Sequence, residues 1–187
     1  EKLRAAKPED KMTVFAVLMR LREICCDPRL VADNWTGSSA KLEACLELVT
    51  EAVAGGHRIL LFSQFTSMLE LLAKRLDEAG VSHFTLQGST PKPVRAEQVR
   101  RFNQGEADVF LISLRAGGTG LNLTAADIVI HYDPWWNLAA QNQATDRAYR
   151  IGQRNPVQVY RLIAQDTIEE KIVELQQAKQ SLADTVT

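Results

Sequence analysis

Short apolar runs alternate with helical apolar stripes along most of the chain. Three mainly apolar runs, Ile59–Phe62, Val109–Ile112 and Ile128–Tyr132, predict strands that are buried on both faces. Weaker patterns predict two further strands, at His83–Leu86 and Val157–Ile163. Strands that alternate with helices in this way are typical of βαβ units, so we expect a mostly parallel sheet.

Apolar residues at helical spacing, bounded by glycine or proline, predict three helices between the strands: Met68–Ala79, Pro93–Asn103 and Leu138–Arg150. Two helical segments precede the sheet, at about Met12–Cys26 and Lys41–Ala54. A final helix begins with a capping box, in which Thr167 and Glu170 satisfy each other's backbone donors. The prediction is one α/β domain with a mostly parallel central sheet flanked by helices, and with helical extensions at both ends.

Length and composition agree with a globular domain. The 187 residues are 45% apolar and 24% charged, which excludes a disordered tail, a collagen-like fibre and a disulfide-stapled miniprotein. The apolar runs are too short to cross a bilayer, and no signal peptide is visible. We therefore expect a soluble intracellular protein with no membrane partner. Because the first residue is Glu1 and not methionine, we also expect that the chain is excised from a longer one.

Charge and cysteine content narrow the possible sites. Twenty-two basic and 23 acidic side chains give a net charge of −1, so any nucleic-acid binding must come from a local patch. The cysteines, Cys25, Cys26 and Cys45, form no CxxC pair. Neither a zinc site nor a disulfide framework is supported. We expect reduced, buried thiols and no metal ligands in this chain.

Three stretches follow predicted strands, where the working loops of open α/β sheets lie. They are Ser63–Thr66, Ser113–Asn122 and Asp133–Asn137. The second contains Gly117, Gly118 and Gly120. Glycines of this kind expose backbone N–H groups and can hold a phosphate, although a plain turn has the same composition.

The predicted helix after Asn137 carries Gln143, Arg147 and Arg150 at positions i, i+4 and i+7, which lie on one face. Two arginines on such a face suit an anion. The alternative is an exposed ion pair between Asp146 and Arg150. No GxxxxGK[ST] phosphate loop occurs in the chain.

Two adjacent tryptophans, Trp135 and Trp136, follow the strand at Ile128–Tyr132. Both cannot point into the same core. One of them could stack on a base or enter a groove. Alternatively, one belongs to the core and the other packs on a neighbouring domain.

Taken together, four stretches resemble the C-terminal RecA-like lobe of Swi/Snf-type ATPases of helicase superfamily two: Ile59–Thr66, Ser113–Thr124, Asp133–Asn137 and Gln143–Gln153. The likeness runs from about Leu18 to Lys179 and includes Leu21–Val31. The ending Arg-Ile-Gly-Gln is highly specific, and the double tryptophan resembles the prokaryotic branch. The resemblance implies three segments: a helical segment at 1–38, the RecA-like lobe at 39–165 and a C-terminal helix at 166–187.

The resemblance also implies roles for individual residues. Arg147 and Arg150 match arginine fingers that reach the γ-phosphate of ATP, and Gln143 matches the glutamine of the same motif. Gly118 and Gly120 match a loop near the nucleotide. The positions that match DNA contacts are Ser63, Gln64, Ser113, Arg115 and Trp136.

The leading hypothesis is therefore half of a motor that moves on double-stranded DNA. ATP and Mg²⁺ would be bound mainly by an N-terminal RecA-like lobe of the same parent chain, so the isolated chain is predicted to be inactive in hydrolysis. The alternative is a non-catalytic DNA- or protein-binding module of the same fold. A dinucleotide-binding enzyme is disfavoured by the glycine spacing. The prokaryotic likeness favours the cytoplasm, near the nucleoid, over the nucleus.

Overall fold

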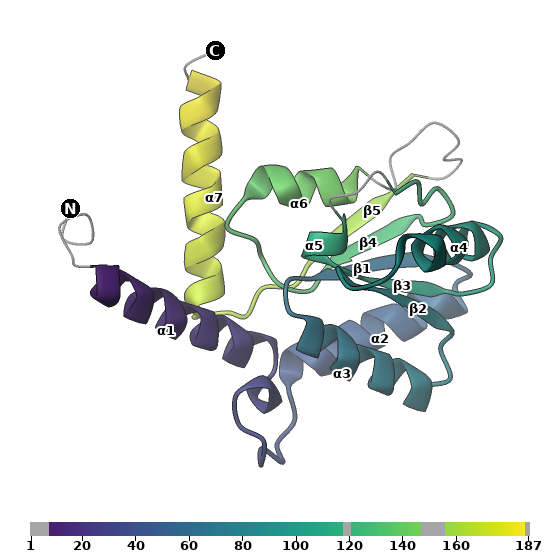
Figure 1. The fold of residues 1–187 in the computed structure, drawn as a ribbon, viewed down its shortest axis with the longest axis horizontal. Helices are drawn as coiled ribbons and strands as arrows, with labels where there is room; N and C mark the ends of the chain where they lie inside the picture. Colours follow the sequence, from purple (N-terminus) through teal and green to yellow (C-terminus); the bar gives the residue numbers. More distant parts are fainter. Residues whose placement is uncertain (1–7, 118–120, 147–155, 186–187) are drawn as a thin grey trace.

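Five parallel strands form one sheet in the order β2-β3-β1-β4-β5, and helices flank it (Figure 1). The structure is a computed structural model that describes residues 8–117, 121–146 and 156–185. The strands are β1 Ile59–Ser63, β2 His83–Leu86, β3 Val109–Ser113, β4 Ile128–His131 and β5 Gln158–Arg161. The predicted α/β class is confirmed, and all the described strands are parallel.

The helices follow the strands in the alternation that the sequence predicts. They are α1 Pro8–Cys26, α2 Ala40–Ala54, α3 Thr66–Glu78, α4 Lys92–Asn103, α5 Leu114–Gly117, α6 Leu138–Thr145 and α7 Ile168–Thr185. A single 3-10 turn, Pro28–Leu30, follows α1. The short α5, which continues directly from β3, was not predicted. The arrangement leaves the carboxyl ends of β1, β3 and β4 together at one edge of the sheet.

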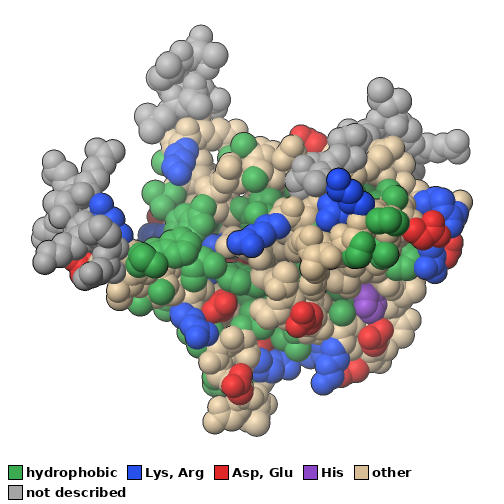
Figure 2. Space-filling view, in the orientation of Figure 1, with side chains coloured by type: hydrophobic (Ala, Val, Ile, Leu, Met, Phe, Trp, Pro, Cys, Tyr) green, Lys and Arg blue, Asp and Glu red, His purple; other side chains and the backbone are tan. Residues whose placement is uncertain are grey.

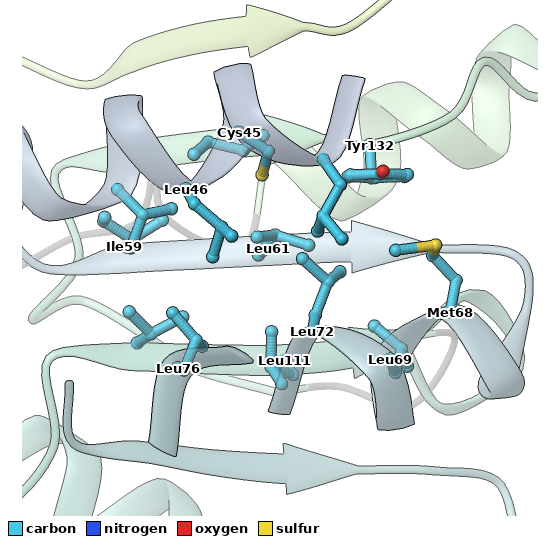
Figure 3. Packing of buried hydrophobic residues seen from close by; sticks show 14 of the residues in the cluster. Cys45, Leu46, Ile59, Leu61, Met68, Leu69, Leu72, Leu76, Leu111 and Tyr132 are labelled. Atoms are coloured by element: carbon cyan, nitrogen blue, oxygen red, sulfur yellow. The ribbon is translucent and has the colours of Figure 1, made fainter. Parts of the chain in front are cut away.

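Each face of the sheet is covered by its own set of helices, because side chains alternate along a strand. Ile59 and Leu61 of β1 belong to the core on the side of α2 and α3, where Leu46 and Leu72 pack (Figure 3). The intervening residues of β1 belong to the second core, which includes side chains from α4, α5 and α6. A sheet that is covered on both faces explains why the strands read as continuous apolar runs.

The start of α7 is capped differently from the prediction. Thr167 Oγ1 accepts a hydrogen bond from the N–H of Glu169 (3.1 Å), and the Glu170 carboxylate accepts from the N–H of Asp166 (2.9 Å). Both side chains therefore cap the helix, but not as the reciprocal pair of a capping box. The difference accompanies the left-handed backbone of Asp166, whose φ is 56°, a conformation that aspartate tolerates better than most residues.

The terminal helices α1 and α7 contact each other on one side of the sheet, and α7 rises steeply away from α1 (Figure 1). On the face shown in Figure 2, hydrophobic side chains gather over α1 and the base of α7. The exposed apolar residues of these helices include Met12, Phe15, Val17 and Leu175. Elsewhere on this face, basic side chains are interspersed with acidic ones, as the near-neutral composition predicts. Within the described ranges, no helix is both long enough and apolar enough to cross a membrane.

The three cysteines carry free thiols, as the sequence predicts. Cys26 and Cys45 are buried in the core beneath α2, and Cys25 is half-buried. Burial raises the pKa of the Cys45 thiol to about 12. Because the thiolate is the reactive form, the buried cysteines behave as small apolar side chains.

Candidate nucleic-acid interface

A groove of about 820 Å³ lies at the carboxyl edge of the sheet. Ser63, the last residue of β1, pairs in register with Ser113, the last residue of β3. The loops after β1, β3 and β4 line the groove, and α1 adds a wall through Met19 and Glu23. Four of the predicted site residues line it: Gln64, Ser113, Arg115 and Trp136. The fold thus brings together side chains that are far apart in the sequence.

The two predicted serines are buried and shape the loops. The Ser63 hydroxyl donates to Asp133 Oδ1 (2.6 Å) and accepts from the N–H of Phe65 (3.2 Å). Ser113 Oγ accepts from the N–H of Ala116 (3.4 Å), at the start of α5. Neither hydroxyl is exposed for contact with a ligand in this arrangement, because both serines are 2% exposed or less. Each serine side chain therefore stabilises, through a hydrogen bond to a backbone N–H, the turn that follows its strand.

Asp133 lies at the centre of this edge of the sheet. The sequence places it in the loop after a predicted strand but assigns it no role. Its side chain is 1% exposed. Besides the Ser63 hydroxyl, its carboxylate accepts from the backbone N–H of Gln64 (3.2 Å). Burial raises the pKa of the Asp133 carboxyl, although the Ser63 hydrogen bond and the charges of Lys41 and Arg22 oppose the shift. Asp133 therefore fixes the loop after β1 to the loop after β4.

Arg22 is the second residue that sequence reasoning missed. It lies on α1, and its side chain is only 1% exposed. One guanidinium nitrogen, Nη2, donates to Gln64 Oε1 (2.7 Å) and to the carbonyl of Pro134 (2.8 Å). The same nitrogen lies 3.8 Å from Asp133 Oδ2. Arg22 thus joins the N-terminal helix to both central loops of the groove.

A sequence signal for Arg22 does exist. Its neighbours three and four positions away on the helix are Leu18, Met19, Cys25 and Cys26, all of them apolar. A charged residue on an apolar helix face predicts a buried, partnered group. The sequence does not reveal the partners, because they lie more than 40 positions further along the chain.

The two tryptophans divide between the core and the groove, as their adjacency predicts. Trp135 is 3% exposed and packs edge-on against Phe62, with 6.5 Å between ring centroids. Its backbone N–H donates to Gln141 Oε1 (3.3 Å), and its carbonyl accepts from Gln176 Nε2. These bonds tie the loop to α6 and α7. Trp136 is half-buried and lines the groove.

The predicted helix at 138–150 is shorter in the structure. The helix α6 ends at Thr145, and Asp146 is its C-cap. Thr145 and Asp146 both have low helix propensity, and an acidic residue is unfavourable at a helix C-terminus. Gln143 is exposed on α6. Arg147 and Arg150 lie outside the described residues, as do Gly118 and Gly120, so their predicted roles stay predictions.

His131, at the end of β4, is a buried base whose protonation opposes folding. Its Nε2 lies 2.8 Å from Thr145 Oγ1, and its ring stacks on Phe62. Burial, with a smaller contribution from the charge of Arg161, lowers the pKa of His131 to about 4 from 6.5. The unfolded chain therefore binds more protons between these two pH values, and the contribution of His131 to stability is lost as the pH falls through this window.

We expect His131→Gln to flatten the acid side of the stability profile. In the unsubstituted chain the titration of His131 is expected to cost about 2–3 kcal/mol between pH 6.5 and 4. Glutamine can keep a hydrogen bond to Thr145 but does not titrate in this range. Urea unfolding at several pH values measures the difference between the two proteins. A difference that stays constant from pH 7 to pH 4 would contradict the assigned titration. The pH-dependent contributions of groups that both proteins share, such as Asp133, cancel in the difference between their free energies of unfolding.

Two observations bear on where Mg²⁺ and the nucleotide phosphates could be held. In the parts of the chain that the structure describes, no group of three or more His, Cys, Asp or Glu side chains could hold a metal ion. The sequence also lacks the phosphate loop that binds the β- and γ-phosphates in nucleotide hydrolases. The chain instead offers a groove with polar side chains and one half-buried tryptophan.

Comparisons with known proteins identify a family that the chain is similar to. The sequence model of one protein family, described as the helicase conserved C-terminal domain, matches residues 40–152. A Mycoplasma pneumoniae protein named "Uncharacterized ATP-dependent helicase" is 40% identical over 97% of this chain, which covers 18% of the relative. The human SWI/SNF-related matrix-associated actin-dependent regulator of chromatin subfamily A member 1 is 38% identical over 95% of the chain, again 18% of the relative.

A solved structure has the same fold. The crystal structure of the C-terminal part of the Fun30 ATPase domain matches with a TM-score of 0.71 and 33% identity, over 84% of this chain and 53% of that one. The chain spans about a fifth of the length of the curated relatives named above. The comparisons therefore cover only one part of each of these relatives.

Proposed function

The chain belongs to the helicase conserved C-terminal domain family, of the Swi/Snf type, and from this premise we propose that it is the second motor lobe of an ATP-driven translocase on double-stranded DNA. The observation that carries the proposal is the groove at the carboxyl edge of the sheet. It gathers four residues that the family resemblance assigns to DNA: Gln64, Ser113, Arg115 and Trp136. The bacterial relative supports action in a prokaryotic cytoplasm.

On the nucleotide side, the proposal assigns this lobe a supporting part. ATP and Mg²⁺ are held mainly by an N-terminal lobe of the parent chain, which supplies the phosphate loop that this sequence lacks. Arg147 and Arg150 reach the γ-phosphate from this lobe, with Gln143 in the same motif, and Gly118 and Gly120 lie near the nucleotide. Arginine suits this role because its charge and N–H donors match phosphate oxygens.

On the DNA side, different residues have different tasks. Arg115 is exposed at the groove and supplies positive charge for a backbone phosphate. The Gln64 amide and the Trp136 ring supply a hydrogen-bond donor and a stacking surface. Ser63 and Ser113 act through the backbone of their loops, because their hydroxyls are buried. Closure of the two lobes during each ATP cycle would move these contacts along the DNA.

The proposal predicts that this chain alone does not hydrolyse ATP, whereas the full-length parent protein does so faster with duplex DNA. The chemistry needs both lobes, so neither half is active by itself. ATPase rates with and without duplex DNA measure this. We expect DNA binding to weaken as salt rises and to depend little on base sequence, since phosphate contacts dominate.

Two results would contradict the proposal. ATP turnover that copurifies with the isolated chain would show that the chain holds a complete catalytic site. A parent protein that binds duplex DNA but shows no ATP hydrolysis would favour the non-catalytic binding module of the same fold.

A further inference from the structure

We propose that Arg22 is a positioning residue for DNA binding, an inference that rests on the proposed translocase function. Arg22 fixes the Gln64 amide and the Trp136 ring on the wall of the groove without contacting DNA itself. The groove would then depend on α1, which lies outside the segment 40–152 that matches the family model.

Burial separates Arg22 from any ligand in the groove. Its side chain is 1% exposed, whereas Gln64 and Trp136 are partly exposed. Its charge lies near the buried carboxylate of Asp133, with 3.8 Å between the nearest atoms. A charge that is buried and compensated in this way adds little to the field that attracts phosphates. Arg22 can therefore act on DNA only through the side chains that it holds.

The contact with Gln64 decides which end of that amide faces the groove. Arginine has only donors, so Gln64 must present its oxygen to Arg22 Nη2, at 2.7 Å. Among the described residues, the amide nitrogen of Gln64 then contacts only Met19 Sδ, weakly, at 4.0 Å. Phosphate oxygens accept hydrogen bonds and cannot donate them unless protonated. The Arg22 bond thus leaves Gln64 with a donor that suits a DNA backbone.

The guanidinium group also lies against two aromatic rings. Arg22 Cζ is 5.5 Å from the ring centroid of Trp136 and 5.6 Å from that of Phe65. Both distances are within the range of cation–π attraction. The Phe65 ring is buried and Trp136 is not. Arg22 therefore links the partly exposed Trp136 ring to the buried Phe65 ring of the core.

The test measures duplex binding by the full-length parent protein with Arg22→Met, using fluorescence anisotropy of a labelled blunt duplex at several salt concentrations. We expect an affinity about tenfold weaker, the scale of a lost hydrogen bond together with a less well held ring. The slope of affinity against salt should not change, because no phosphate contact is removed. The matched control is Arg100→Met, since Arg100 is exposed, pairs with Glu97 and does not line the groove.

A double-mutant cycle separates positioning from general stabilisation. If Arg22 acts through Gln64, then Arg22→Met should cost clearly less affinity in a Gln64→Ala background than in the unsubstituted protein. Equal costs in both backgrounds, measured per folded molecule, would overturn the inference. A salt slope that becomes shallower by about one phosphate contact would also overturn it, because Arg22 would then touch DNA directly.

Gln64→Glu tests the same geometry without disturbing the buried arginine. A carboxylate at this position can still accept from Arg22, but it presents an acceptor and a negative charge to the groove. We expect a loss of affinity of at least tenfold. Affinity equal to that of the unsubstituted protein would overturn the inference alone. Failure of the unsubstituted protein to bind duplex DNA would overturn the proposed function and the inference with it.

Discussion

Replacing Arg147 by alanine in the full-length parent protein is expected to lower the kcat of DNA-stimulated ATP hydrolysis by roughly a thousandfold. Arg147 and Arg150 lie in the stretch Gln143–Gln153, where the resemblance to Swi/Snf-type ATPases is most specific. An arginine at the γ-phosphate neutralises charge that develops in the transition state, so its loss lowers kcat more than it weakens ATP binding. Steady-state ATPase assays with saturating ATP and duplex DNA measure the effect, and Arg150→Ala should show a loss of the same order.

The control for these two variants is a neighbouring arginine outside the motif. Arg154 lies one position beyond Gln153, and Arg154→Ala is expected to leave kcat unchanged. Duplex binding should persist in the Arg147→Ala and Arg150→Ala proteins, because the groove residues are intact. If both variants keep the unsubstituted kcat, the arginines are structural and the catalytic part of the proposal is wrong.

The sequence predicts the sheet well because its signals are local. A strand covered on both faces needs a continuous apolar run, and Val109–Ile112 therefore marks β3 to within one residue. His83–Leu86 coincides with β2 although its pattern is weaker. The end of α6 was predicted wrongly, because the apolar spacing carries no information about a stop at Thr145. The predicted edge for the working loops is the edge where the groove lies.

The buried hydrogen bonds beneath the groove, such as those of Arg22 and Ser63, could not be predicted, because they depend on contacts between distant segments. The partners of Arg22 lie after β1 and β4, and a pattern of spacings does not say which strands become neighbours. The same limit applies to Ser63, whose match to a DNA-contact position says nothing of the hydrogen bond that buries its hydroxyl. Local sequence identifies the loops, and the order of the strands decides which side chains face one another.

Lys41→Met is expected to lower the free energy of unfolding of this chain by about 3–5 kcal/mol, the usual cost of removing one partner of a buried ion pair. Lys41 Nζ lies 2.6 Å from both carboxylate oxygens of Glu169, and the two side chains are 8% and 1% exposed. Without Lys41, the Glu169 carboxylate stays buried with the N–H of Ala164 as a remaining donor, at 2.7 Å. Urea unfolding followed by circular dichroism measures the loss.

Two further variants establish the cause. Lys171→Met removes an exposed ion pair with Glu174 on α7, and no measurable change in stability is expected. Adding Glu169→Gln to Lys41→Met should restore much of the lost stability, because a neutral amide costs less to bury than an unpaired carboxylate. If the second substitution restores nothing, the loss comes from packing around Lys41, and the ion pair does not anchor α7 to α2. Full recovery would instead show that the cost of Lys41→Met is the burial of the unpaired Glu169 carboxylate, so that the Lys41–Glu169 pair compensates a buried charge at the start of α7.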